Sequence, residues 1–148
     1  MTGRAVVDAS VAAKWVFPEN DSDRAVRLLE RYESGSLLLM APELFVSEVA
    51  NLAWKKAVLR REVELADAVE ALRLILAACP ELFPTLQLVS RAFDLASLHR
   101  RPIYDCLYVA LALEHSSPLI TADRALVKAF EPGLGSVQLL ADTDTEAL

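Results

Sequence analysis

Short apolar runs, separated by stretches with helical spacing, make up most of the chain. Five runs have the length and the aliphatic or β-branched character of strands: residues 4–7, 37–40, 85–89, 119–121 and 137–140. A continuous apolar run such as residues 4–7 suits a strand that is buried on both faces. The pattern therefore predicts several short strands inside a sheet.

Apolar residues at helical spacing, framed by capping residues, fill the intervals between these runs. The predicted helices run from the caps at 20–23 to the Ser-Gly-Ser stop at 34–36, from Pro42 to about Leu59, from Glu62 to before Pro80, from Ser90 to about Arg101, from Asp105 to Leu113, and from Asp123 to Phe130. Residues 106–113 are all apolar, so this helix must be covered nearly all round and is the predicted central helix.

Strands that alternate with helices are typical of an α/β fold with a parallel sheet. We expect one domain over residues 1–148, a central sheet of four to five short strands, helices on both faces, and a C-terminal end that frays. Ligands of such sheets bind beyond the carboxyl ends of the strands. Residues that carry chemistry should therefore lie at that edge.

Composition narrows the classes of function. The hydrophobic share is 54%, yet no apolar run approaches the roughly 18 residues of a membrane span, so we expect a soluble protein. Two cysteines without metal-site spacing indicate neither a disulfide framework nor a zinc site, and we expect a cytoplasmic location. The net charge of -6 argues against unselective nucleic-acid binding, so a polyanionic substrate would need a local cationic track.

Four acidic residues lie beside apolar or otherwise ordered segments, where a charged carboxylate is unexpected: Asp8, Glu48, Asp105 and Asp123. Asp8 ends the first strand, and Asp123 lies two residues past the strand at 119–121, so both project toward the same edge of the sheet. Asp105 heads the central helix, where it could also be a simple cap, and Glu48 lies on an apolar helical face or at its solvent edge. If the fold gathers the four, mutual repulsion requires a divalent cation or shared protons.

Polar and basic residues near these acids complete the candidate site. Ser10 and Thr121 each stand two positions from an aspartate, and Asn51 follows Glu48 by one turn; their side chains could orient carboxylates or water, although capping is the simpler role for Ser10. Lys14 and Arg124, which are close in sequence to site acids, are candidates for binding a polyanionic substrate. The basic residues Lys55, Lys56, Arg60 and Arg61 could extend the track or form a solvated helix face.

Four segments in order resemble the PIN-domain nucleases, and more narrowly the VapC-type toxins: Val7-Asp8-Ala9-Ser10, Glu48-Val49-Ala50-Asn51, residues 104–112 and Thr121-Ala122-Asp123-Arg124. The resemblance implies a Mg²⁺- or Mn²⁺-dependent endoribonuclease that cuts single-stranded or looped RNA. It also implies a homodimer or higher complex silenced by a VapB-like antitoxin. Asp8, Glu48, Asp105 and Asp123 carry over as catalytic residues, with Asp8, Asp105 and Asp123 as metal ligands. Ala125 and Leu126 stand where some relatives have a further carboxylate, which puts a second metal in doubt.

Other readings of the same residues lead to different chemistry. His99 and His115 could serve a metal-free ribonuclease, although both lie at helix ends. An aspartyl-phosphate protein would need a second aspartate after Asp8, and the chain has none there. A non-enzymatic module could use the carboxylates only to bind a partner's arginines. For an antitoxin, the predicted docking surface comprises Phe45, Trp54, Leu65 and Val69.

Overall fold

A five-stranded parallel sheet forms the centre of the computed structural model, which describes residues 2–131 and 136–148. The strand order is β3-β2-β1-β4-β5, and all four neighbouring pairs are parallel. The strands are β1 (Gly3–Val7), β2 (Leu37–Pro42), β3 (Glu81–Phe83), β4 (Leu119–Thr121) and β5 (Val137–Leu139). The predicted α/β fold class is therefore confirmed.

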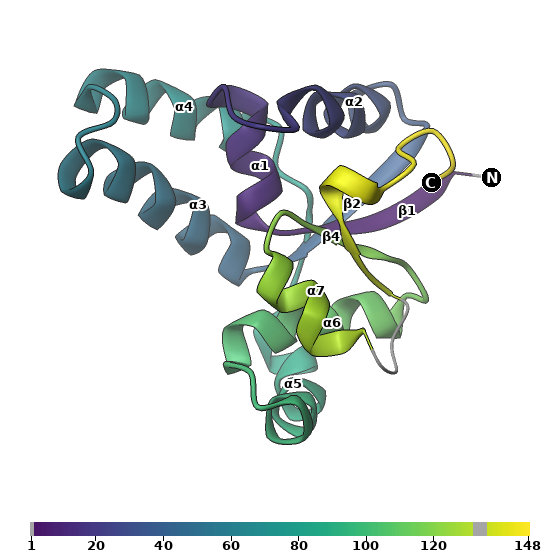
Figure 1. Cartoon of the computed structure of the whole chain (residues 1–148). Helices are drawn as coiled ribbons and strands as arrows, with labels where there is room; N and C mark the ends of the chain where they lie inside the picture. The colour runs from purple at the N-terminus through teal and green to yellow at the C-terminus, as the bar shows by residue number, and fades with distance from the viewer. Residues whose placement is uncertain (1, 132–135) are drawn as a thin grey trace.

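Helices cover both faces of the sheet (Figure 1). They are α1 (Ala9–Val16), α2 (Ser22–Glu33), α3 (Leu44–Trp54), α4 (Leu65–Ala77), α5 (Thr85–His99), α6 (Ile103–Glu114) and α7 (Arg124–Phe130). Helices α3 and α4 form an antiparallel arm that projects to one side, and a π-helical turn, Lys55–Leu59, extends α3 at its tip. No helix among the described residues combines the length and apolarity needed to cross a membrane.

Helix α6 is the central helix that the apolar run predicts. Residues 106–112 are all buried, since the sheet and helix α5 enclose them. The helix begins earlier than expected, because Pro102 occupies the N-cap and Asp105 lies within the first turn. A carboxylate in the first turn still interacts favourably with the helix dipole.

The predicted strand at residues 85–89 is wrong, because Thr85 begins helix α5. Leu88 is buried while Leu86 and Val89 are exposed, which fits helical rather than alternating placement. The Glu43 carboxylate accepts a hydrogen bond of 3.0 Å from the Thr85 backbone N–H and so satisfies one free donor of that helix. The third strand is instead β3, a short edge strand between two prolines, and Ser90 lies inside α5 rather than at its cap.

The C-terminal segment, expected to fray, is tied to helix α2. The Arg31 guanidinium donates hydrogen bonds to the backbone carbonyls of Thr145 and Leu148, and Arg24 donates to that of Thr143. Thr143 and Thr145 are buried. Gly3 permits the close approach of Leu148, because a Cβ at position 3 would lie 2.5 Å from the Leu148 backbone.

Candidate active site

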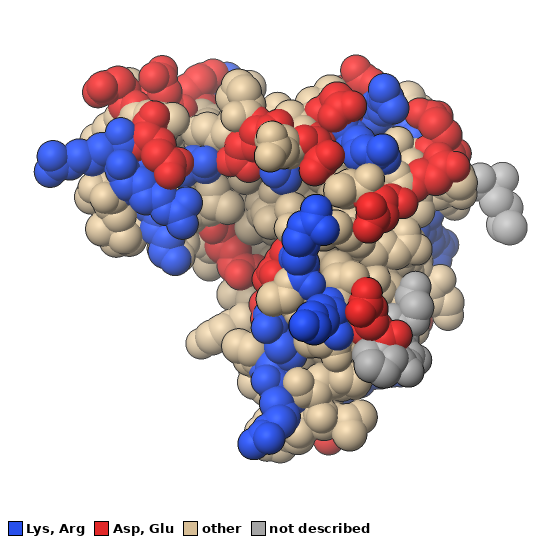
Figure 2. All heavy atoms as spheres, in the orientation of Figure 1, with Lys and Arg blue, Asp and Glu red and all other residues tan. Residues whose placement is uncertain are grey.

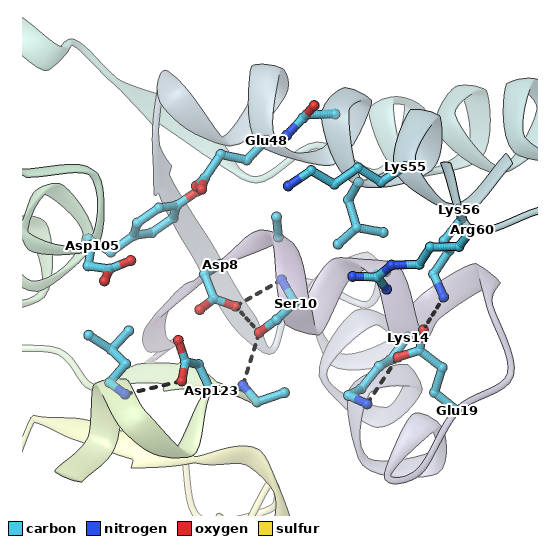
Figure 3. Close-up of a pocket in the computed structure, with 17 residues that line it drawn as sticks. Asp8, Ser10, Lys14, Glu19, Glu48, Lys55, Lys56, Arg60, Asp105 and Asp123 are labelled. Carbon is cyan, nitrogen blue, oxygen red and sulfur yellow. Dashed lines mark hydrogen bonds and ion pairs between the residues drawn. The ribbon is translucent and has the colours of Figure 1, made fainter. Parts of the chain in front are cut away.

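A cavity of about 410 Å³ lies where strands β1 and β4 end, and helices α1, α3, α6 and α7 contribute to its lining. All four acidic residues singled out from the sequence line it: Asp8 follows β1, Glu48 lies on α3, Asp105 on α6, and Asp123 before α7. Figure 3 shows the carboxylates of Asp8, Asp105 and Asp123 turned toward a common space. The fold thus brings together acids that are far apart in the sequence.

Asp8 is the most enclosed of the four acids. Its Oδ1 accepts hydrogen bonds from the Ser10 hydroxyl and from the backbone N–H groups of Ser10 (3.1 Å) and Val11 (3.3 Å), and its Oδ2 accepts one from the Thr121 hydroxyl. Burial raises the pKa of Asp8, and these hydrogen bonds only partly oppose that rise. The carboxylate has no basic partner among the described ion pairs. Its charge is therefore poorly compensated.

Two hydroxyl groups connect the Asp8 and Asp123 loops. The Thr121 hydroxyl donates to Asp8 and accepts the Asp123 backbone N–H at 3.1 Å. The Ser10 hydroxyl also donates to Asp8, and it accepts the Ala122 backbone N–H at 3.0 Å. Ser10 and Thr121 therefore fix the spacing of two candidate ligands. Asn51 lines the cavity from α3.

Asp8 and Asp123 also begin helices. Asp8 is the N-cap of α1, a helix that the sequence patterns did not reveal, and Asp123 is the N-cap of α7. The Asp123 Oδ1 accepts the backbone N–H groups of Ala125 at 2.9 Å and Leu126 at 3.2 Å. Each side chain thus has a structural role in addition to the negative charge that it brings to the cavity.

Glu48 receives a hydrogen bond from a tyrosine that the sequence analysis did not select. The Tyr108 hydroxyl donates to Glu48 Oε1 at 2.6 Å, and the tyrosine also lines the cavity. Burial raises the pKa of Glu48 first, and the nearby charges of Asp8 and Asp105 raise it further, while the Tyr108 hydrogen bond lowers it. Burial and the Glu48 charge also raise the pKa of Tyr108 far above its usual range, so this hydroxyl stays protonated. The sequence signal for Tyr108 is its position three residues after Asp105, which places both side chains on one face of the same helix.

Asp105 pairs with Arg101, a second residue that the sequence analysis missed. The Arg101 Nη2 lies 2.7 Å from Asp105 Oδ2 and 3.8 Å from Asp123 Oδ2. The spacing of four residues between Arg101 and Asp105 could have indicated the first contact, although Arg101 precedes the helix.

The donor set suits a hard divalent cation that keeps much of its water. Carboxylate oxygens are the ligands that Mg²⁺ and Mn²⁺ prefer, and Mg²⁺ commonly binds through only one or two of them. The cavity has room for such waters. Across residues 2–131 and 136–148, no three acidic, histidine or cysteine side chains lie close enough together to hold a metal ion between them. The arrangement therefore fits a loosely chelated ion rather than an all-protein cage.

Basic residues line the opposite wall of the cavity, but only some of them are available to a ligand. Lys14 and Lys56 both contact Glu19, at 3.2 and 2.7 Å, and Lys14 also donates to the Asn20 carbonyl. Figure 3 shows Lys55 and Arg60 pointing toward the cavity, and Arg60 Nη1 also lies 3.8 Å from Glu62 Oε1. In Figure 2 acidic atoms are visible inside the hollow as well as elsewhere on this face, and basic atoms lie on both rims of the hollow.

Two of the other predicted cations lie elsewhere. Arg124 lines a second, smaller hollow, which Lys14 also borders. Arg61 has a left-handed backbone conformation and is not among the described residues that line the acidic cavity. Lys55 and Arg60 thus point into the acidic cavity, whereas Lys14 is ion-paired at its wall and Arg124 lines the second hollow.

The competing catalytic groups lie outside the cavity. The His99 ring packs on Phe130 with centroids 4.3 Å apart, and the His115 ring contacts Phe83 edge-on at 4.7 Å. Neither histidine is among the described cavity residues. Cys106 is buried, and burial raises the pKa of its thiol to about 11. None of the three is placed to act on a ligand of the acids.

Comparison with known proteins agrees with this geometry. The family model for the PIN domain matches residues 5–130, so the chain belongs to the PIN domain family. It is 35% identical to Ribonuclease VapC3 of Pyrobaculum aerophilum over 129 residues, which are 86% of this chain and 95% of the relative. The resemblance inferred from the sequence motifs is thereby confirmed.

Two solved structures share the fold. The crystal structure of PAE2754 from Pyrobaculum aerophilum has a TM-score of 0.69 and 22% identity, and covers 95% of this chain and 93% of its own. The structure of VapC20 from Mycobacterium tuberculosis, described as a sarcin-ricin loop cleaving toxin, has a TM-score of 0.60 and 18% identity, and covers 84% and 94%. At these identities the likeness establishes the fold alone.

Proposed function

We propose that the chain is the toxin of a type II toxin-antitoxin pair, and that it is a Mg²⁺- or Mn²⁺-dependent endoribonuclease acting on single-stranded or looped RNA in the cytoplasm. The observation that carries the proposal is the convergence of Asp8, Glu48, Asp105 and Asp123 on one open cavity. Membership of the PIN domain family and 35% identity to a protein named as a ribonuclease support it.

In this proposal Asp8, Asp105 and Asp123 hold the ion. When bound, it supplies a more acidic water and neutralises charge on the scissile phosphate. The Asp8 charge is buried without a basic partner among the described residues, so it gains most from a cation. Thr121 and Ser10 keep its two oxygens oriented.

Glu48 is the proposed general base. Tyr108 holds its Oε1 at 2.6 Å, and this leaves Oε2 to accept a proton from the attacking water. The pKa of Glu48 is raised and so lies closer to neutral pH. A carboxylate with a higher pKa is a stronger base. Tyr108 acts as a positioning residue for that carboxylate.

The experiment that tests the proposal is cleavage of a defined single-stranded RNA by the purified chain. We expect cleavage in Mg²⁺ or Mn²⁺, loss of cleavage in EDTA, and products with 5'-phosphate and 3'-hydroxyl ends, as attack by water on phosphorus with the 3'-oxygen as leaving group produces. Cleavage that persists in EDTA and leaves 2',3'-cyclic phosphates would instead indicate attack by the RNA 2'-hydroxyl. Bound Mn²⁺ without cleavage of any RNA tested would support a binding module.

Lys55 is the proposed contact for the RNA backbone. Lys55→Ala should raise KM about tenfold, and it should reduce the slope of log KM against log salt by about one, because one phosphate contact is lost. The measurement is cleavage kinetics over a series of salt concentrations. Arg27→Ala is the matched control, since it removes the same charge from the exposed face of α2. An equal effect of the two substitutions would contradict the assignment.

An antitoxin is the proposed protein partner. The prediction that Phe45 belongs to the docking surface is wrong, because this side chain is fully buried. The other three residues, Trp54, Leu65 and Val69, are 47%, 62% and 62% exposed on the α3–α4 arm. We propose that a VapB-like segment covers this arm, in a complex that contains two or more copies of the chain. Co-expression of the chain with a VapB-like antitoxin, followed by light scattering of the purified complex, tests both points.

A further inference from the structure

Arg101 is fixed in the short link between helices α5 and α6. Arg100, the C-cap of α5, has a left-handed backbone with φ 54°, and Pro102 is the N-cap of α6. Arg101 therefore stands immediately before the start of α6. Arg100 and Pro102 restrain the backbone on either side of Arg101, so the Cα position of Arg101 is well defined.

A positive charge at this place does not stabilise the helix. The N-terminal end of α6 carries the positive end of the helix dipole, which disfavours a neighbouring cation. The Arg101 side chain is only 23% exposed, and its Nε is buried without a hydrogen-bond partner among the described residues. The arginine thus loses water and gains no acceptor for its Nε–H, so the helix does not explain its placement.

The two carboxylates of the active site explain the placement of Arg101. The Arg101 Nη2 lies 2.7 Å from Asp105 Oδ2 and 3.8 Å from Asp123 Oδ2, and so bridges helix α6 and the loop before α7. Both acids line the cavity, whereas Arg101 is not among the described cavity residues. The guanidinium therefore approaches the acids from outside the space that a ligand would use.

We propose that Arg101 is a positioning residue that serves as a built-in counter-ion for Asp105 and Asp123, so that the arginine and a bound Mg²⁺ or Mn²⁺ neutralise the same charges. The inference rests on the metal site of the proposed function. If both cations act on the same carboxylates, each contributes more to stability when the other is absent. The arginine thus keeps the empty site folded and at the same time weakens metal binding.

Calorimetric titration of Mn²⁺ into the metal-free chain tests this coupling. Arg101→Met should lower the metal-free Tm and bind Mn²⁺ about tenfold more tightly, within the usual range for coupling between two sites. By linkage, saturating Mn²⁺ should then raise the Tm of the variant more than that of the wild type. Arg101→Lys keeps the charge and should bind Mn²⁺ with nearly the wild-type affinity.

Arg73→Met is the matched control. Arg73 lies 2.6 Å from Glu70 on the exposed face of α4, so the substitution also removes an ion pair but leaves the cavity unchanged. Its Mn²⁺ affinity should equal that of the wild type. Neither measurement uses RNA cleavage.

Each outcome decides the proposal. Unchanged or weaker Mn²⁺ binding by Arg101→Met overturns the counter-ion role and leaves the proposed ribonuclease intact. A variant that folds only when Mn²⁺ is present supports the role, and one that fails to fold under both conditions overturns it. If the wild-type chain itself takes up no Mn²⁺, the proposed metal site fails and the inference fails with it.

Discussion

Asp8→Asn should reduce RNA cleavage by about three orders of magnitude or more while the protein remains folded. The expected loss corresponds to roughly 4 kcal/mol of transition-state stabilisation, a size that metal-derived charge neutralisation can supply. Asparagine caps helices about as well as aspartate, so the α1 cap is kept. Alanine would remove the cap as well as the charge, at a cost of about 1 kcal/mol, and would confuse the two effects.

The pH dependence of the stability of Asp8→Asn is an independent test of the buried Asp8 charge. Because burial raises the pKa of Asp8 above its ordinary value of 3.8, the folded state favours the protonated carboxyl, and ionisation on raising the pH destabilises the metal-free fold. Without metal, Asp8→Asn should therefore become more stable relative to the wild type as the pH rises from below 3.8 toward neutrality. Denaturant unfolding across this pH range measures the difference. Asp94→Asn on the exposed face of α5 is the control, and full cleavage by Asp8→Asn would count against the site.

Glu48→Gln should lower kcat by about a hundredfold to ten-thousandfold, the usual contribution of a positioned general base. The amide oxygen can still accept the Tyr108 hydrogen bond, so the local structure is preserved. Mn²⁺ affinity should change less than in Asp8→Asn, because Glu48 is proposed to act on water. Steady-state kinetics and calorimetry separate these effects.

Tyr108→Phe completes the Glu48 test through the pH profile. The Tyr108 hydrogen bond lowers the pKa of Glu48, so its removal should raise that pKa and move the acidic limb of the pH-rate profile to higher pH. A profile that stays in place while kcat falls would show that Glu48 is not the titrating base. A Glu48→Gln variant with wild-type kcat would exclude it altogether.

The parallel sheet and the central helix could be predicted because continuous apolar runs form most of their strands and the buried part of the helix. The wrong strand at residues 85–89 and the unpredicted elements β3 and α1 have local physical causes. Residues 85–89 contain threonine, leucine and valine, which suit either element, and the decisive feature is a helix start after Pro84. Strand β3 is too short to give a pattern, and α1 follows Asp8 directly, so the cap of α1 coincides with the residue that ends strand β1.

The acids of the site could be predicted because a carboxylate beside a buried strand or an apolar helix is unusual and conspicuous. Their neighbours depend on contacts that no local pattern contains. Glu19 neutralises Lys14 and Lys56 from separate parts of the chain, and Arg101 reaches Asp123 across two elements. The sequence therefore indicates which acids line the cavity, but it does not indicate which basic side chains are paired with acids.

The helix-capping role of Asp8 and Asp123 has a genetic consequence. A single base change converts an aspartate codon into an asparagine codon, and asparagine preserves both caps. Disarming the protein is therefore a short mutational step that costs little folding energy. Under the proposed toxin function, cells that escape its activity should accumulate inactive copies that are still well folded and can still bind the proposed antitoxin.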